Sequence, residues 1–559
     1  MRGAVSSVML ATVLLAGCSE ATQSESTVDS ATATVAADTY SFNENYRDYL
    51  ATLSADEFAG RAPASIGEEL TVAMVEEKFK AWGLKPYNAE TGSYQQPVPL
   101  VKMMPYKVSE MSFSAADLEP LAYRTEMMAW SPRVQERTEL VDSELVFAGY
   151  GIVAPEYGWN DYEGLDVAGK TVVVLVNDPG YDSQDPEVFN GKAMTYYGRW
   201  TYKFEEAARQ GAAGVLVIHE TGPAGYGWGV IAGGSPVRFD LARENKNMDL
   251  SAVQGWLSEA SADKLFARIG SSYAEMRQRA QAEDFSPISL ETGINLSVDT
   301  KFEYLDSPNL IGYIEGKTHP EEHIVYMAHW DHMGTDPINP DDGIYNGAQD
   351  NASGTAGVLA LAEFWASQPQ PERSVVFVLV TAEERGLLGS QWYANQPMLP
   401  LSKAVAGINM DVMNVYGPVN DMVVVGYGNS ELEDYLGKYV AKQGRYLAPE
   451  PTPEAGSFYR SDHFNLAKKG VPMLYAKGGQ DHIEYGKEYG QQQRAEYVRD
   501  AYHKPADEYD PNWDLRGVQQ DLWLYFWVGE ELANSRDWPQ WRDGNEFKAI
   551  RDASANERR

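Results

Sequence analysis

The second half of the chain alternates short apolar runs with longer segments whose apolar residues recur at helical spacing. The apolar runs predict strands at 309–314, 324–329, 375–381, 405–411, 423–426 and 472–476. The amphipathic segments predict helices at 355–367, 387–395, 431–443, 494–503 and 518–533. Such alternation is typical of an α/β fold with a mostly parallel central sheet and helices on both faces. Residues 68–82 predict one further, earlier helix, which ends at Gly83.

The texture of the sequence changes between residues 108 and 298. Strand-like runs occur at 144–151, 170–176 and 214–218, with a short helix predicted at 204–210. This stretch contains the single histidine His219 and no cluster of metal ligands. We interpret it as a β-rich domain inserted into the main domain of the protein. Residues 40–107 and 299–540 would then form the main domain, and 541–559 a charged tail that we expect to be frayed.

The first 18 residues have the pattern of an export signal. Arg2 precedes an apolar stretch too short to span a bilayer, and residues 15–18 read LAGC, which resembles the bacterial lipobox. We therefore expect lipidation at Cys18 and a flexible tether over 19–39. Residue 19 is serine rather than aspartate, which by resemblance to bacterial lipoprotein sorting implies the outer membrane, with the protein facing the periplasm or the cell surface. The alternative is an ordinary secretory signal with a chance cysteine.

Composition narrows the classes of partner and ligand. The 559 residues carry a formal net charge of -35, which disfavours nucleic acid as a partner because its phosphates would be repelled. Cys18 is the sole cysteine, so the mature chain has no disulfide and no thiolate ligand for a metal.

Residues that bind metals recur at the ends of predicted strands. They are His329, Asp350, Glu383, Glu384, Asp411 and His503. Each one alone has a commoner structural explanation, such as a helix cap for Asp350. Because open α/β sheets keep their sites at the carboxyl ends of the strands, the whole set favours one metal centre. Zinc accepts imidazole and carboxylate ligands where thiolates are absent.

The set resembles the di-zinc aminopeptidase family of clan MH, relatives of glutamate carboxypeptidase. The matching pieces are DEFAGRAP at 56–63, AHWD at 328–331, GAQDNASG at 347–354, TAEERGLLGS at 381–390, INMD at 408–411, SDH at 461–463 and YHKPAD at 502–507. FAGYG at 147–151 and QGAAGVLVI at 210–218 resemble the protease-associated domain that many such enzymes carry as an insertion.

The resemblance implies a role for each matched residue. Asp350 would bridge two zinc ions, with His329 and Asp411 completing one ligand set and Glu384 and His503 the other. Glu383 would be the general base that takes a proton from a water shared by the ions. Asp331 would accept the second ring proton of His329, and the peptide bond between residues 350 and 351 would be cis.

Other residues near the motifs have less definite roles. Relatives place a tyrosine upstream of the Ser-Asp-His element to help hold the oxyanion, which makes Tyr459 a candidate; packing under the loop is the alternative. His463 is a second candidate for lining the substrate pocket. His332 is not at a matching ligand position, and His482 is expected to be an ordinary loop residue.

The predicted function is an exopeptidase that removes N-terminal residues from peptides. A carboxypeptidase or dipeptidase of the same clan is the alternative, because Arg385 and Arg460 lie near motif residues and could hold a substrate carboxylate. A one-zinc glutaminyl cyclase and an inactive binding protein are disfavoured, because all five ligand positions and Glu383 are present. Cobalt or manganese could replace zinc at such a site. The preferred residue, the role of the insertion and the oligomeric state stay open.

Overall fold

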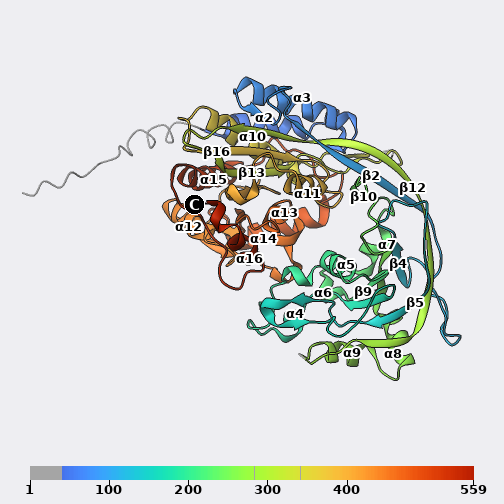
Figure 1. Ribbon diagram of the computed structural model, residues 1–559. Helices are drawn as coiled ribbons and strands as arrows, with labels where there is room; N and C mark the ends of the chain where they lie inside the picture. The colour runs from blue at the N-terminus through green and yellow to red at the C-terminus, as the bar shows by residue number, and fades with distance from the viewer. Residues whose placement is uncertain (1–40, 283, 340–341, 559) are drawn as a thin grey trace, which may run out of the picture. The chain divides into compact units, whose positions relative to one another are not determined.

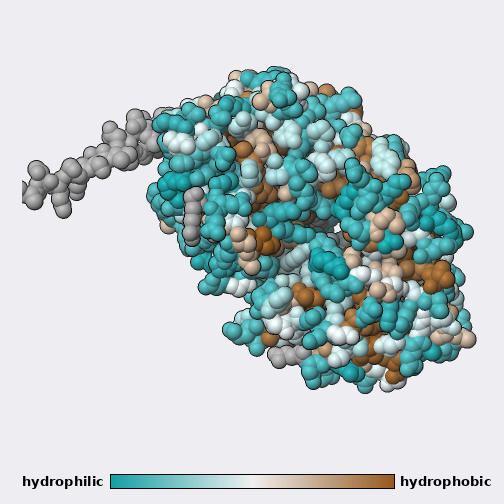
Figure 2. Space-filling view, in the orientation of Figure 1, coloured by the Kyte–Doolittle hydropathy of each residue, from teal (hydrophilic) through white to brown (hydrophobic). Residues whose placement is uncertain are grey.

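The computed structural model describes residues 41–282, 284–339 and 342–558, and residues 42–559 form one compact unit (Figure 1). The predicted signal segment with Cys18 and the tether lie outside the described residues. Within the described ranges no helix is both long enough and apolar enough to cross a bilayer. Figure 2 shows mainly hydrophilic residues on the face in view, in keeping with the net charge of -35.

Four parallel strands form the centre of the sheet. Their order is β16 (Arg373–Val380), β13 (His319–His329), β17 (Ala404–Asn409) and β20 (Met473–Gly478). The edge is completed by β18 (Asp421–Val424) and β19 (Tyr446–Pro449). All residues of β16 and β17 are buried, which explains why these strands have continuous rather than alternating apolar sequences.

Helices cover both faces of this part of the sheet, which confirms the predicted α/β fold. Figure 1 shows α2 (Asn43–Leu53), α3 (Ile66–Ala81) and α10 (Ser353–Ala366) on one side of β13 and β16. On the other side lie α11 (Leu388–Asn395) and α13 (His463–Ala467). Helices α12 (Leu432–Lys442), α14 (Gly486–Glu496) and α15 (Arg516–Asn534) also belong to this part. Phe42 packs against both Phe364 and Trp523, joining α10 and α15 at the N-terminus of α2.

Two long antiparallel strands, β2 (Gln95–Val108) and β12 (Ile288–Ile314), extend the sheet beyond β16. Through β12 it continues into β5 (Arg137–Phe147), β8 (Thr171–Leu175), β9 (Gly214–His219), β11 (Val253–Ser258) and β4 (Met127–Trp130). Six helices lie in the same stretch: α4 (Pro179–Ser183), α5 (Trp200–Arg209), α6 (Thr221–Ala224), α7 (Trp228–Gly233), α8 (Glu259–Arg268) and α9 (Tyr273–Ala280). The predicted boundary at 298 falls inside β12, and the inserted protease-associated domain stays a prediction.

The C-terminal segment is packed, so the prediction of a frayed tail is wrong. It contains α16 (Lys548–Ala553), and its Trp541 and Phe547 side chains are buried. The indole of Trp541 donates to the carbonyl of Gly470 at 3.0 Å. The buried guanidinium of Arg551 donates to the carbonyls of Ala404 at 2.8 Å and Val405 at 3.2 Å. Arg551, one of the charged residues of this segment, is therefore buried and attaches the segment to β17, which composition alone did not reveal.

The predicted helix at 494–503 is displaced. In the structure α14 begins eight residues earlier, at Gly486, and is followed by one π-helical stretch, Tyr497–Ala501. His503 lies beyond this stretch in the left-handed backbone region, with φ 56°. His503 therefore does not continue the helix, and its side chain projects in a different direction from that of a helical residue.

Candidate metal centre

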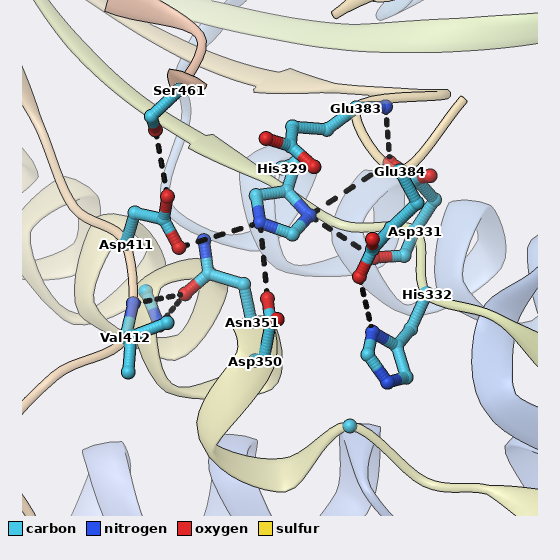
Figure 3. A network of polar contacts seen from close by, with 12 residues as sticks. His329, Asp331, His332, Asp350, Asn351, Glu383, Glu384, Asp411, Val412 and Ser461 are labelled. Carbon is cyan, nitrogen blue, oxygen red and sulfur yellow. Dashed lines mark hydrogen bonds and ion pairs between the residues drawn. The ribbon is translucent and has the colours of Figure 1, made fainter. Parts of the chain in front are cut away.

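Four of the six predicted site residues come together because three adjacent parallel strands end at the same edge of the sheet. Figure 3 shows these four residues together with Asp350. His329 is the last residue of β13, Glu383 and Glu384 follow β16, and Asp411 follows β17. Asp350 precedes α10 and His503 follows the π-helical stretch. The geometry confirms the predicted convergence of residues that lie up to 174 positions apart, from 329 to 503.

Asp350 lies between two sets of donor atoms. His329 Nε2 is 3.4 Å from Asp350 Oδ1 and 3.5 Å from Asp411 Oδ1. On the other side, His503 Nε2 is 3.2 Å from both Asp350 Oδ2 and Glu384 Oε2. Ligands about 2.0–2.2 Å from a tetrahedral zinc ion lie roughly 3.3–3.5 Å apart. The donor atoms thus have the chemistry and the spacing of zinc ligands.

Electrostatics also fit a site for cations. The carboxylates of Glu383, Asp350 and Asp411 raise the pKa of His329 well above its usual value, although burial alone would lower it. Burial raises the pKa of Glu383 well above its ordinary range; His329 opposes this shift, and Glu384 adds to it. Several carboxylates buried this close together repel one another unless cations neutralise them.

Glu383 lies beside the first donor set. One atom each of His329, Glu383 and Asp411 lie within 4.8 Å of one another. Its backbone N–H donates to Asp331 Oδ1 at 3.0 Å, which holds the chain after β16 against the chain after β13. The carboxyl group of Glu383 is thereby positioned at the edge of the ligand group.

Asp331 contacts His329, but in a different way from the prediction. Its backbone carbonyl, not its carboxylate, accepts the Nδ1–H of His329 at 3.1 Å. The carboxylate is 3.9 Å from the same nitrogen. Because a carbonyl can only accept, this contact places the proton on Nδ1 and leaves Nε2 free to face Asp350 and Asp411.

His332 lies at the site, although the motif resemblance did not place it among the ligands. Its Nδ1 lies 2.6 Å from Glu384 Oε1, and one donor each of His332, Asp350 and Glu384 lie within 4.8 Å of one another. A distance of 2.6 Å is shorter than the spacing of two ligands on one zinc ion, so it indicates a direct contact that orients Glu384. Gly347 makes room for His332, since a Cβ there would lie 2.4 Å from its ring.

Arg61 is a second supporting residue that the motif 56–63 contained but did not explain. Its fully buried guanidinium donates to the carbonyls of Leu53 (2.6 Å), Trp330 (2.9 Å), Asn346 (2.6 Å) and Gly347 (2.8 Å). Burial lowers the pKa of Arg61 to about 10, although Asp507, Asp331, Asp350 and Glu384 act in the opposite direction. This arginine therefore joins the loops before Asp350 and after His329.

The loop that carries Asp350 is held by side chains on both sides. The backbone N–H groups of Gln349 and Asp350 donate to the two carboxylate oxygens of Asp507, at 2.9 and 3.0 Å. Asn351 donates through its amide to the carbonyl of Met410 at 3.0 Å. The peptide bond between Asp350 and Asn351 is cis, as the resemblance implied.

Asp411 is surrounded by polar groups from the loop after η7 (Ser457–Arg460) and from β20. Ser461 Oγ donates to Asp411 Oδ2 at 2.7 Å, and the Tyr475 hydroxyl lies 3.4 Å from the same oxygen. Lys477 Nζ donates to the backbone carbonyl of Asp411 at 3.1 Å, and burial lowers its pKa to about 8. Sequence reasoning missed Tyr475 because nothing in its apolar strand marks it as different from a core residue.

Of the two tentative pocket residues, Tyr459 lines the cavity described below, but its hydroxyl is bonded away from the predicted ligands. The Tyr459 hydroxyl donates to Glu546 at 2.8 Å, so the tyrosine hydroxyl beside the predicted ligands is that of Tyr475 instead. His463 is fully buried behind Tyr475, with ring centroids 4.9 Å apart, and does not line the substrate cavity described below. Burial lowers the pKa of His463 to about 3, which keeps the ring neutral.

The ligand group opens into a cavity of about 1210 Å³. All five predicted ligands and Glu383 line it, together with residues 199–201, 205, 226 and 230. Arg460 also lines the cavity, whereas Arg385 donates to the carbonyl of Met333 and packs over Phe239 outside it. The donor atoms therefore face a cavity whose walls come from both parts of the sheet.

Comparisons with known proteins agree with this site. Residues 309–527, which include every predicted ligand and Glu383, match the model of peptidase family M28. The chain is 30% identical over 125 residues to mouse "Aminopeptidase NAALADL1", covering 21% of this chain and 15% of that protein. It is 33% identical over 103 residues to "Vacuolar membrane protease" of Kluyveromyces lactis, covering 17% of this chain and 10% of that protein. The matches thus span only 10–15% of the length of these curated relatives.

Two solved aminopeptidase structures are also similar to this chain. An aminopeptidase from Aneurinibacillus sp. strain AM-1 aligns with a TM-score of 0.46 at 18% identity, covering 88% of this chain and 94% of that chain. The zinc aminopeptidase of Bacillus subtilis aligns with a TM-score of 0.41 at 17% identity, covering 89% and 96%. The family match and the donor geometry together support a zinc-type metallopeptidase.

Proposed function

We propose that the protein is a di-zinc aminopeptidase that hydrolyses the N-terminal residue of peptides. The observation that carries this proposal is the position of Asp350, whose two oxygens face two separate sets of donors at 3.2–3.4 Å. His329, Asp350 and Asp411 would hold one ion, and His503, Asp350 and Glu384 the other. When bound, the ions would supply positive charge that activates water and stabilises negative charge on the substrate carbonyl.

Glu383 is the residue that would move protons. It lies beside the donor group, and the Asp331 carboxylate holds its backbone in place. The Glu383 carboxylate would take a proton from the attacking water and deliver it to the departing amine. The hydroxyl of Tyr475, next to Asp411, replaces Tyr459 as the candidate donor to the developing oxyanion.

A panel of substrates tests the assignment. Purified protein should cleave aminoacyl chromogenic substrates and peptides with a free amine, and activity should disappear with a chelator and return with zinc. Turnover of N-blocked peptides with free C-termini would instead establish the carboxypeptidase alternative. The lipobox-like segment adds the proposal that the enzyme is exported and anchored through Cys18, which radiolabelled palmitate incorporation would test in wild type against Cys18→Ala.

A further inference from the structure

A buried arginine without an acidic partner lines the same cavity as the candidate ligands. Arg199 is only 8% exposed, and its Nε has no hydrogen-bond partner among the described residues. Among the described residues, the titratable side chains that influence it are Arg460 and the phenols of Tyr226 and Tyr459, with no carboxylate among them. Burial, and then Arg460, lower the pKa of Arg199 to about 10. A buried guanidinium is costly unless something pairs with it, so this group is poised for an anion.

The start of α5 adds further positive potential at the same place. Arg199 immediately precedes this helix of 10 residues, and Trp200 and Thr201 of its first turn also line the cavity. Among the described residues, no side chain caps this end, and its first turn has no acidic residue. A helix N-terminus presents free N–H groups and about half a positive charge, which favours carboxylates and other anions.

Arg460 links this end of α5 to the metal centre. It is exposed in the cavity wall at the end of η7, directly after Tyr459. Its charge acts on Arg199 and also on Tyr502, whose other charged neighbours are Asp350, Glu384 and Glu383. Tyr502 in turn stacks on His503, with ring centroids 3.9 Å apart. Arg460 is thus within electrostatic range of the metal centre, and Arg199 lines the same cavity beside it.

We propose that Arg199, Arg460 and the first turn of α5 bind a carboxylate of the peptide while its scissile bond lies at the metal centre. This inference rests on the proposed function and specifies its substrates as short peptides with a free C-terminus or peptides with an acidic residue near the cleaved bond. Guanidinium groups suit this task because they hold a carboxylate through two parallel hydrogen bonds. The C-terminus and an acidic side chain both offer a carboxylate, so an experiment must decide which of the two is bound.

Three matched peptides separate the possibilities: Leu-Ala-Ala, its C-terminal amide, and the amide of Leu-Glu-Ala. We expect KM for the free acid to be about 10-fold or more below that of the plain amide, with kcat little changed, because charge-assisted hydrogen bonds are involved. If the Glu-containing amide shares this advantage, the site accepts either carboxylate, and if only the free acid has it, the C-terminal carboxylate is the bound group. An advantage of the Glu-containing amide alone would assign the acidic side chain. Equal KM for all three peptides would overturn the proposal.

Substitutions then identify the residues. Arg199→Gln and Arg460→Gln should each abolish the preference for the carboxylate, whereas Arg238→Gln, which removes a guanidinium packed over Trp130 outside the cavity, should preserve it. Retention of the preference in both cavity variants would refute the assignment. Arg460 is exposed, so its variant should fold even if loss of the buried Arg199 proves too disruptive.

A binding measurement keeps this test separate from the proposed function. Calorimetry on Glu383→Gln protein should show tighter binding of the free acid than of its amide, whether or not the wild type hydrolyses either peptide. Absence of any peptide hydrolysis with a preserved difference in binding would contradict only the proposed function. Hydrolysis without any such difference would contradict only the carboxylate site.

Discussion

The carboxylate of Asp331 accepts the backbone N–H of Glu383 at 3.0 Å. This bond joins the chain after β13 to the chain after β16, directly beside the candidate metal ligands. The same residue accepts the His329 ring proton through its backbone carbonyl. Asp331 therefore acts on both the proposed base and a proposed ligand, but through two different groups.

Replacement of Asp331 separates these two contacts. We expect Asp331→Ala to lower kcat by about 10- to 100-fold, the range found for residues that support metal ligands, because Glu383 loses its anchor while the carbonyl contact survives. Asp331→Asn keeps an oxygen that can accept the N–H and should retain more activity. Steady-state kinetics with metal analysis would measure this, and equal activity in all three proteins would contradict the role.

Loss of the Glu383 carboxylate should affect turnover and not metal content. We expect Glu383→Gln to reduce kcat by about 10²–10⁴-fold, the usual contribution of a general acid–base group. Bound zinc, measured by elemental analysis, should stay at the wild-type level. A parallel loss of metal would show that Glu383 is a ligand instead.

Metal stoichiometry tests the division of the donors into two sets. We expect two zinc ions in the wild type and a loss of about one in His503→Ala, because His503 contacts only the set that contains Glu384. His332→Ala should lower zinc affinity more mildly, since its contact is with Glu384 rather than with an ion. His482→Ala is the control, because this histidine lies outside the cavity lining. One zinc ion in the wild type would contradict the two-ion arrangement.

Acid should destabilise the fold through His323, far from the metal centre on β13. Burial lowers its pKa from 6.5 to about 4, and the nearby charge of Arg551 adds to this shift. The hydrogen bond from its Nδ1 to the Glu321 carbonyl opposes the shift, while its Nε2 has no partner among the described residues. Between these pH values the unfolded chain binds more protons, so stability falls as pH decreases from about 6.5 to about 4. The loss is on the order of 3 kcal/mol.

The measurement is the free energy of unfolding in denaturant at several pH values. His323→Asn should show a shallower decrease between pH 6.5 and pH 4, since asparagine does not titrate. His319→Gln, at a partly exposed position on the same strand, should leave the slope unchanged. An unchanged slope in the His323 variant would argue against the shift.

The packed C-terminal segment should contribute to global stability. Arg551→Met removes two buried hydrogen bonds to β17 and leaves the Ala404 and Val405 carbonyls without this donor. We expect a loss of about 2–4 kcal/mol in the free energy of unfolding, because unsatisfied buried polar groups are costly. Arg542→Met, whose ion pair with Asp434 is exposed, is the matched control and should cost less than about 1 kcal/mol. Equal effects would indicate that the segment is not anchored through Arg551.

The fold class and most helix positions of the C-terminal half were predictable, because each depends on local periodicity. The helix predicted at 518–533 corresponds to α15 (Arg516–Asn534), and the strand at 375–381 to β16 (Arg373–Val380). The helix at 494–503 was misplaced and the tail was misread, because burial of polar sequences depends on distant partners. From the sequence alone Arg551 is expected to be a solvated charge, but in the structure it is buried against the carbonyls of β17.

For the candidate site, the sequence by itself determined which residues could hold zinc and in what order they occur, since chemistry and position relative to strands are local properties. Only the tertiary structure decided that Asp350 faces both donor sets, that His332 contacts Glu384, and that Tyr475 rather than Tyr459 lies beside Asp411. It also decided that Arg199 opens into the same cavity without a carboxylate partner. The physical reason is that each of these relationships joins segments far apart in the chain, whose distances depend on the packing of the whole sheet.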